Sequence, residues 1–149
     1  MWESITTLLR EIAQAVRIAN RYTETVDLLN GGTQGLTATW TNLGDYVDVK
    51  RDLEAALWLK ITVGTSTAIQ FRVLGKYDIQ SANEFEMPIE LKTSSAVLVN
   101  PEYFELTGSG NQSIVVSFNT SKLVPYVKIQ VKDAAAGSGS ITVAQLTKS

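Results

Sequence analysis

Residues 52–78 read DLEAALWLKITVGTSTAIQFRVLGKYD, and this stretch decides the fold. Its first half is apolar at every odd position through residue 63, and apolar residues alternate with polar ones again from residue 69 to residue 73. A period of two is typical of a strand with one buried face. The GTST between the two halves has the composition of a turn. The stretch therefore predicts a long antiparallel hairpin with a core formed by Leu57, Leu59, Ile61, Phe71 and Val73.

Short alternating segments on both sides of this hairpin predict the rest of a β domain. We expect strands at residues 36–41, 46–49, 84–92, 96–99, 103–107, 113–119, 126–132 and 141–146. Turn residues separate these segments at short, regular intervals, which is typical of a two-sheet sandwich or jelly roll. Strands do not alternate with helices, and this argues against a parallel α/β sheet. The predicted fold is mainly β, an antiparallel β-sandwich or jelly-roll-like domain.

The N-terminal segment carries the strongest helical pattern. Its apolar residues are spaced alternately three and four apart, at Ile5, Leu8, Ile12, Ala15, Ala19, Tyr22, Val26 and Leu29. This heptad pattern predicts one long amphipathic helix over residues 1–30. A glycine-rich joint at 31–35 would connect it to the β-sandwich domain at 36–149.

Two interpretations of this helix stay open. It can lie on its own β domain, or it can pack against copies of itself in an oligomer. A helix of about 28 residues is about 40 Å long, which exceeds what a small sandwich easily covers. Under the second interpretation the helix serves oligomerisation or anchoring, with an interface formed by Ile5, Leu8, Ile12, Ala15, Ala19 and Tyr22.

The composition excludes several kinds of site. The 149 residues suit one domain with a sizeable core, and they include no cysteine and no histidine. Because there is no cysteine, disulfides and thiolate ligands are excluded. Because there is no histidine either, histidine-based catalysis and most zinc sites are excluded as well. The net charge of −2 argues against a nucleic-acid partner, and no long apolar run predicts a membrane span. We expect no enzymatic activity, no cofactor and no metal.

Two groups of carboxylates are the candidates for chemistry. Asp45, Asp48 and Asp52 lie close together, but their spacing matches no calcium-binding loop, and we expect solvated turn residues. The carboxylates at positions 84, 86 and 90 share one face of a predicted strand. Catalysis by paired carboxylates needs a cleft that gives the two groups different environments. We therefore interpret this second group as an ordinary polar sheet face.

Aromatic residues are the candidates for surface contact. Trp58 and Tyr126 fall on the outer faces of their predicted strands, where they can contact a protein neighbour. Together with Trp40 they are also candidate platforms for sugar rings. The remaining interpretation is that the helix or a second sheet covers them.

The C-terminal part of the sequence carries a resemblance to a known group of proteins. From Leu123 the chain reads LVPYVKIQVKDAAAGSGSITVAQL, which is similar to the C-terminal β-hairpin of small β-sandwich structural proteins of tailed-phage virions. The pair Thr39-Trp40, the LGDYVDV of residues 43–49 and the LWL of residues 57–59 resemble the opening of the same kind of domain. The N-terminal helix is the main departure from that pattern.

This resemblance implies a non-enzymatic virion structural protein, a homo-oligomer expected to be a trimer, assembled in the host cytoplasm and located in the virion. Its partners would be copies of itself and other virion proteins such as the major capsid protein, with no nucleic acid and no membrane. Within this class we expect a capsid decoration or head-fibre protein. The alternatives are a tail or baseplate protein and a carbohydrate-binding β-sandwich module.

Overall fold

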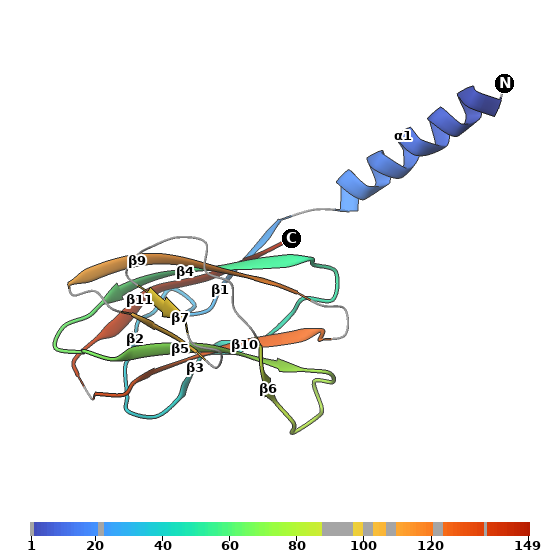
Figure 1. Ribbon diagram of the computed structural model, residues 1–149. Coiled ribbons are helices and arrows are strands. Elements are labelled where there is room, and N and C mark those ends of the chain that lie inside the picture. The colour runs from blue at the N-terminus through green and yellow to red at the C-terminus, as the bar shows by residue number, and fades with distance from the viewer. Residues whose placement is uncertain are drawn as a thin grey trace.

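The computed structural model describes residues 2–20, 23–87, 97–99, 103–106, 110–120, 124–135 and 137–149, with helix side chains from residue 2 to residue 15. Two antiparallel sheets face each other, and one helix projects from an end of the sandwich (Figure 1). The predicted fold class, mainly β with a β-sandwich preceded by one helix, is confirmed. In chain order the elements are α1 (Trp2–Asn20), β1 (Glu24–Asp27), β2 (Gln34–Gly35), β3 (Thr41–Asp48), β4 (Glu54–Thr62), β5 (Ile69–Lys76), β6 (Phe85–Glu86), β7 (Val97–Val99), β8 (Phe104–Leu106), β9 (Asn111–Asn119), β10 (Tyr126–Asp133) and β11 (Ser140–Lys148).

The core lies between the two sheets. One sheet, which we call the β4 sheet, has the order β1-β11-β4-β9, with β2 also paired to β11. The other, the β5 sheet, has the order β3-β10-β5-β8-β7, with β6 also paired to β5. Phe71 stacks on Phe104 at the centre, with 5.0 Å between the ring centroids. The predicted core is confirmed, because none of its five residues is more than 1% exposed: Leu57, Leu59, Ile61, Phe71 and Val73.

The predicted hairpin between β4 and β5 is wrong. β4 pairs with β11 and β9, whereas β5 pairs with β10, β8 and β6, so the two strands belong to opposite sheets. Alternation specifies which side chains face the core, but it does not specify which strand supplies the hydrogen bonds. The turn after residue 62 crosses the gap of about 10 Å between the sheets. Leu53, also predicted inside, is exposed because it precedes β4.

β10 and β11 are also divided between the two sheets, so the C-terminal segment is not a hairpin either. The two crossing turns pack on each other. The Thr65 amide donates to Ser138 Oγ at 3.0 Å, and the Gly139 amide donates to Ser66 Oγ at 2.9 Å. A Cβ on Gly137 would collide with the Ser66 backbone. This close approach explains why the second turn consists of small residues.

The helix ends earlier than predicted. It stops at Asn20, and Glu24–Asp27 form β1, which pairs with β11. The β-branched residues Thr23, Thr25 and Val26 favour a strand over the last turns of a helix. Residues 31–35 are therefore not the joint between helix and sandwich, since the chain has already entered the β4 sheet. The boundaries 1–30, 31–35 and 36–149 need correction, because the sandwich begins with β1.

The glycine-rich segment forms a turn within the sandwich. The Asp27 carboxylate accepts hydrogen bonds from the backbone amides of Leu29 at 3.1 Å and Gly31 at 2.9 Å. Gly31 has a φ of 77°, which favours glycine there. Leu28 at the start of this turn is buried in the core.

Two other predicted segments also differ. Residues 36–40 are not a strand, and the predicted turn at 42–45 lies inside β3. Gly44 adopts a φ of 72° there, and the pairing of β3 with β10 shifts register beside it, as in a bulge. Of the predicted strand 84–92 the structure describes residues 84–87, of which Phe85–Glu86 form β6, and residues 88–92 lie outside the described residues.

Candidate functional site

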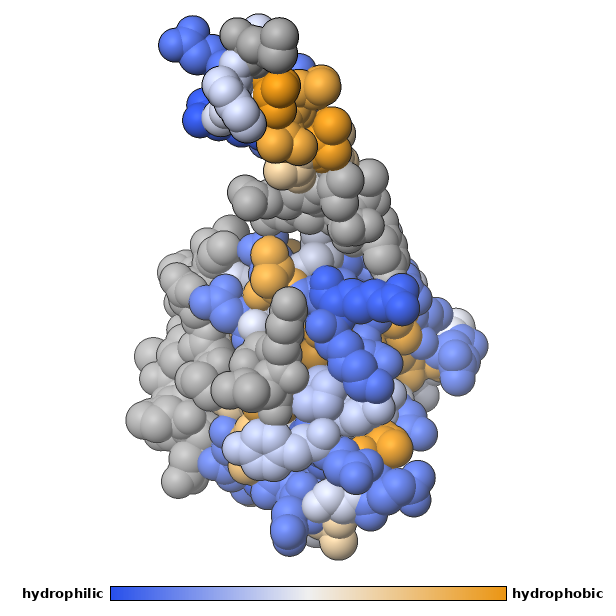
Figure 2. All heavy atoms as spheres, turned by 90° about the vertical axis from the view of Figure 1, so that its right-hand side faces the viewer, coloured by the Kyte–Doolittle hydropathy of each residue, from blue (hydrophilic) through white to orange (hydrophobic). Residues whose placement is uncertain are grey.

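The apolar side of α1 is exposed. Ile5, Leu8 and Ile12 are 42 to 55% exposed, and Leu9 beside them is 61% exposed. The helix points away from the sandwich, and its hydrophobic side forms one patch near the end of the molecule (Figures 1 and 2). Every described side chain of α1 is exposed, including that of Ala15.

Four of the six predicted interface residues lie in the described part of α1. These are Ile5, Leu8, Ile12 and Ala15. The side chain of Ala19 and the whole of Tyr22 lie outside the described residues. In the described part of the chain the sandwich does not cover the stripe, in contrast to the interpretation of a helix lying on its own domain. Packing against copies stays a prediction.

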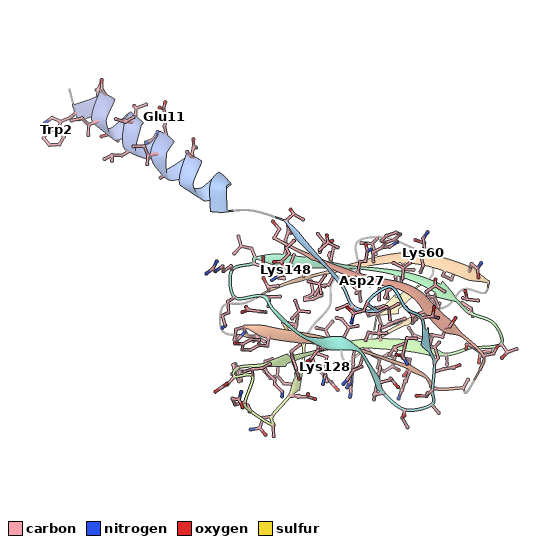
Figure 3. All side chains as sticks on the ribbon, turned by 180° about the vertical axis from the view of Figure 1, so that it is seen from behind. Trp2, Glu11, Asp27, Lys60, Lys128 and Lys148 are labelled. Atoms are coloured by element: carbon pink, nitrogen blue, oxygen red, sulfur yellow. The ribbon has the colours of Figure 1, made fainter. Side chains whose placement is uncertain are left out.

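The polar side of α1 satisfies its own groups. The hydroxyls of Thr6 and Thr7 donate to the carbonyls of Trp2 and Glu3, each at 2.9 Å. Glu3 lies in the first turn, where a negative charge is favourable to the helix dipole. Figure 3 shows Trp2 at the end of the helix far from the sandwich. One side of the helix is therefore polar and suited to contact with water, whereas the opposite side is apolar.

The three candidate aromatic residues do not share a platform. Trp58 lies half-buried on the β4 sheet, where its Nε1 donates to Ser113 Oγ at 3.0 Å and Lys60 Nζ is 5.3 Å from its ring centre. Tyr126 and Trp40 belong to the β5 sheet side. Lys60 and Lys128 in Figure 3 mark these two opposite faces. A sugar ring cannot stack on all three residues.

The rings on the β5 side are already in contact with cations. Lys50 Nζ lies 4.8 Å from the Tyr126 ring centre. The Cζ atom of Arg72 lies 4.4 Å from the centre of the Trp40 ring, and Arg72 Nε donates to Gln130 Oε1 at 2.8 Å. Such cation–π contacts cover the ring faces that a sugar would need.

Tyr46 and Glu84 complete this outer network; the sequence predicts the outward position of Glu84 but makes no prediction for Tyr46. Tyr46 lies between Lys76 and Lys128, whose Nζ atoms are 4.6 and 4.7 Å from its ring centre. Its hydroxyl donates to Glu84 Oε1 at 2.5 Å, and Lys128 Nζ donates to the same oxygen at 2.9 Å. The position of Tyr46 depends on the pairing of β3 with β10, which no local sequence signal specifies.

The pKa values of Glu84 and Tyr46 are shifted by these contacts. The Tyr46 hydroxyl first, and then the Lys128 ammonium, hold the pKa of Glu84 below its usual value. Burial first, and then the hydrogen bond to Glu84, raise the pKa of Tyr46. Both shifts keep Tyr46 a donor and Glu84 an acceptor at neutral pH. The pair therefore joins β3 to the segment before β6 on the outer face of the β5 sheet.

The two predicted carboxylate groups behave differently. Asp45 and Asp48 are exposed as predicted, but both lie in β3 rather than in a turn, and the same prediction for Asp52 is wrong because that residue is buried. Asp52 and Glu24 each lie 3.4 Å from Lys148 Nζ, and this charge pairing is what permits burial. Among the described residues no group of three or more aspartate or glutamate side chains is arranged to hold a metal ion.

The other carboxylate group is paired as well. Glu84 is bound as described above, and Glu86 Oε1 lies 3.3 Å from an Arg72 guanidinium nitrogen. Glu90 lies outside the described residues. The two described carboxylates therefore neutralise cations on the outer face of the β5 sheet.

Comparison of the sequence with known proteins gives no match, either to a family model or to a characterised protein. Within the described part of the chain no helix is both long enough and apolar enough to cross a membrane.

Proposed function

We propose that the protein is a non-enzymatic structural protein that assembles as a homotrimer through α1. The observation that carries this proposal is the exposed apolar stripe of the helix, led by Ile5, Leu8 and Ile12. A contiguous exposed apolar patch of this kind marks an interaction site in a soluble protein. The heptad spacing of the stripe is the pattern by which helices pack against one another.

The helix has a physical reason to associate. Its 19 residues extend over about 28 Å, and most of the stability of a helix in a protein comes from packing of its apolar face. Burying the stripe against other helices supplies the missing stabilisation. Isoleucine at Ile5 and Ile12 with leucine at Leu8 suits a two-stranded coil, but the apolar residues Leu9 and Val16 widen the stripe. This wider stripe favours three helices over two.

The place of assembly is inferred from the sequence resemblance to β-sandwich proteins of tailed-phage virions. We assign the protein to the virion as a capsid decoration or head-fibre protein, with copies of itself and the major capsid protein as partners. A tail or baseplate position is the alternative within the same class. Paired and stacked side chains on the β5 face are consistent with a binding rather than a catalytic protein.

Substitution of the stripe tests the assembly. Ile12→Asp places a carboxylate in an apolar seam, where desolvation disfavours the charge. Light scattering should give the mass of three chains for the natural protein and of one folded chain for this variant. Gln14→Asp, which introduces the same charge on the polar side of α1, is the matched control and should remain trimeric. A natural protein that is monomeric throughout the micromolar range contradicts the proposal.

The virion assignment needs a separate measurement. Mass spectrometry of purified particles propagated from the genome that encodes the chain should detect the protein, and antibody labelling in electron micrographs should mark the head. Labelling of the tail would favour the alternative position. Absence from particles, together with measurable affinity for glycans, would favour the carbohydrate-binding module instead.

A further inference from the structure

The outer face of the β4 sheet has a shallow hollow next to the end where α1 leaves the sandwich. It has a volume of about 460 Å³, and its floor is a row of facing positions on β11, β4 and β9. We call it the helix-proximal hollow; its floor is formed by Ala56, Val115, Ser117 and Thr147, and Thr23, Glu54 and Ser149 also line it.

The chemistry of this hollow differs from the rest of the outer surface. The side chains of its floor are uncharged, and Val115 among them is 38% exposed, while Glu54 supplies one carboxylate to the lining. The Ser117 hydroxyl oxygen is buried without a hydrogen-bond partner among the described residues. On the β5 sheet, by contrast, the outward positions carry cations and carboxylates in contact with one another. An uncharged, hollowed region of a sheet face is the part that another protein surface can cover with little desolvation cost.

The hollow is continuous with the stripe of α1 along the chain. α1 ends at Asn20, β1 begins at Glu24, and Thr23 between them lines the hollow. Three residues span at most about 10 Å, so the hollow stays near the base of the helix. When several helices pack in parallel around one axis, their bases converge, and the hollows of the attached sandwiches are brought next to that axis.

The helix alone offers too little contact for a stable assembly. A seam about 28 Å long and about 10 Å wide covers about 300 Å². Even two such seams per chain stay below the roughly 800 Å² that each partner contributes to a standard interface. A stable assembly therefore needs a second contact, which the sandwich must supply at the helix base.

We infer that the helix-proximal hollow is covered by a second copy of this chain, which adds a sandwich contact to the helix seam. This inference rests on the proposed self-association of α1. The neighbouring copy presents the same uncharged floor at the base of its own helix, so the two floors can meet without a charged side chain between them, with Glu54 as the one carboxylate in each lining.

Two variants on one strand test this contact. Ala56 and Thr62 both lie on β4 and face outward on the same sheet, but Thr62 lies at the opposite end. Ala56→Glu should raise the dissociation constant at least about tenfold, because it forces a carboxylate into the covered hollow. Thr62→Glu should leave the constant within about twofold. Analytical ultracentrifugation measures the constants, and circular dichroism checks that both variants are folded.

The outcomes separate this inference from the proposed function. A trimer that both variants preserve overturns the covered hollow while self-association through α1 stands. A natural chain that is monomeric at all concentrations overturns both. Equal weakening by both glutamates also overturns the inference, because the effect would then not be confined to the hollow.

Thiol labelling tests whether a second copy or the chain's own helix covers the hollow, and it does not require the glutamate variants to fold. The protein has no cysteine, so Ala56→Cys carries a single thiol. This thiol should react with a maleimide at least about tenfold more slowly in the trimer than in an Ile12→Asp background, while Thr62→Cys should react equally in both. Equal protection of the Ala56→Cys thiol in both backgrounds means that the chain covers its own hollow and overturns the inference.

Discussion

Leucine and isoleucine lie in two opposite environments in this protein. In the sandwich, Leu57 and Ile61 are at most 1% exposed, whereas Leu8 and Ile12 on α1 are 55% and 50% exposed. Both sets follow a regular apolar period in the sequence. The difference teaches that periodicity identifies a face that has to be covered without identifying what covers it. In the sandwich a second sheet of the same chain covers it, and on α1 no described part of the chain does.

The largest expected effect is on the sandwich side of this comparison. Phe71→Ala removes a ring that stacks on Phe104 at the core, and buried aromatic truncations cost roughly 3–5 kcal/mol. Leu9→Ala on α1 also removes an apolar group, but in the monomeric Ile12→Asp background its position is exposed, and there it should change the unfolding free energy by less than about 0.5 kcal/mol. Urea unfolding followed by tryptophan fluorescence measures both. A loss below about 1 kcal/mol for Phe71→Ala would contradict the assignment of the core.

The alternation of residues was sufficient to predict the sandwich class and its core, because side chains on a strand point to opposite faces in turn. It was not sufficient to predict pairing. A hairpin and a crossing between two sheets present the same inward residues, and what accompanies the crossing here is the packing of Ser66 against the 137–139 turn. That contact joins residues far apart in the sequence, so no local pattern reveals it.

At the end of α1 the apolar spacing predicted a helix that is too long. Val26 and Leu29 continue the heptad spacing, so the pattern alone extends the helix through them. The pairing of β1 with β11 decides otherwise, supported by a hydrogen bond between the hydroxyls of Thr25 and Thr147 at 3.0 Å. The candidate interface on α1 was predictable because it depends on local spacing, whereas the β5 network and the hollow depend on strand order.

A smaller effect on stability is expected from the network of polar side chains on the outer face of the β5 sheet. The folded pKa of Glu84 is lowered by Tyr46 and then Lys128, so its contribution to stability is present above the unfolded pKa of about 4.3. This contribution is lost as the pH falls through the lower, folded pKa. Glu84→Gln should therefore show less loss of stability between neutral pH and about pH 3 than the natural protein does.

Urea midpoints across this pH range measure the effect of Glu84. Asp78→Asn removes a carboxylate from an exposed position, keeps an acceptor for the Gln80 amide, and is the control, which should follow the natural protein. Identical pH profiles for Glu84→Gln and the natural chain would show that the Tyr46 and Lys128 contacts do not hold in solution.

Removal of α1 is expected to have the smallest effect on the unfolding free energy of the sandwich. It tests most directly the comparison between the covered and the uncovered apolar faces. Fragment 23–149 keeps β1 and all described core residues, and α1 contributes no described side chain to the core. The fragment and the full-length Ile12→Asp variant, both monomers, should unfold within about 0.5 kcal/mol of each other by urea titration. Fragment 33–149 removes β1 and the buried Leu28, and should be destabilised by at least about 2 kcal/mol, as truncation of a buried leucine is. Equal stability of the two fragments would place the boundary of the sandwich at the glycine-rich turn. A marked loss in fragment 23–149 would mean instead that the helix rests on its own sandwich in solution, and the contrast between covered and uncovered apolar faces would fail.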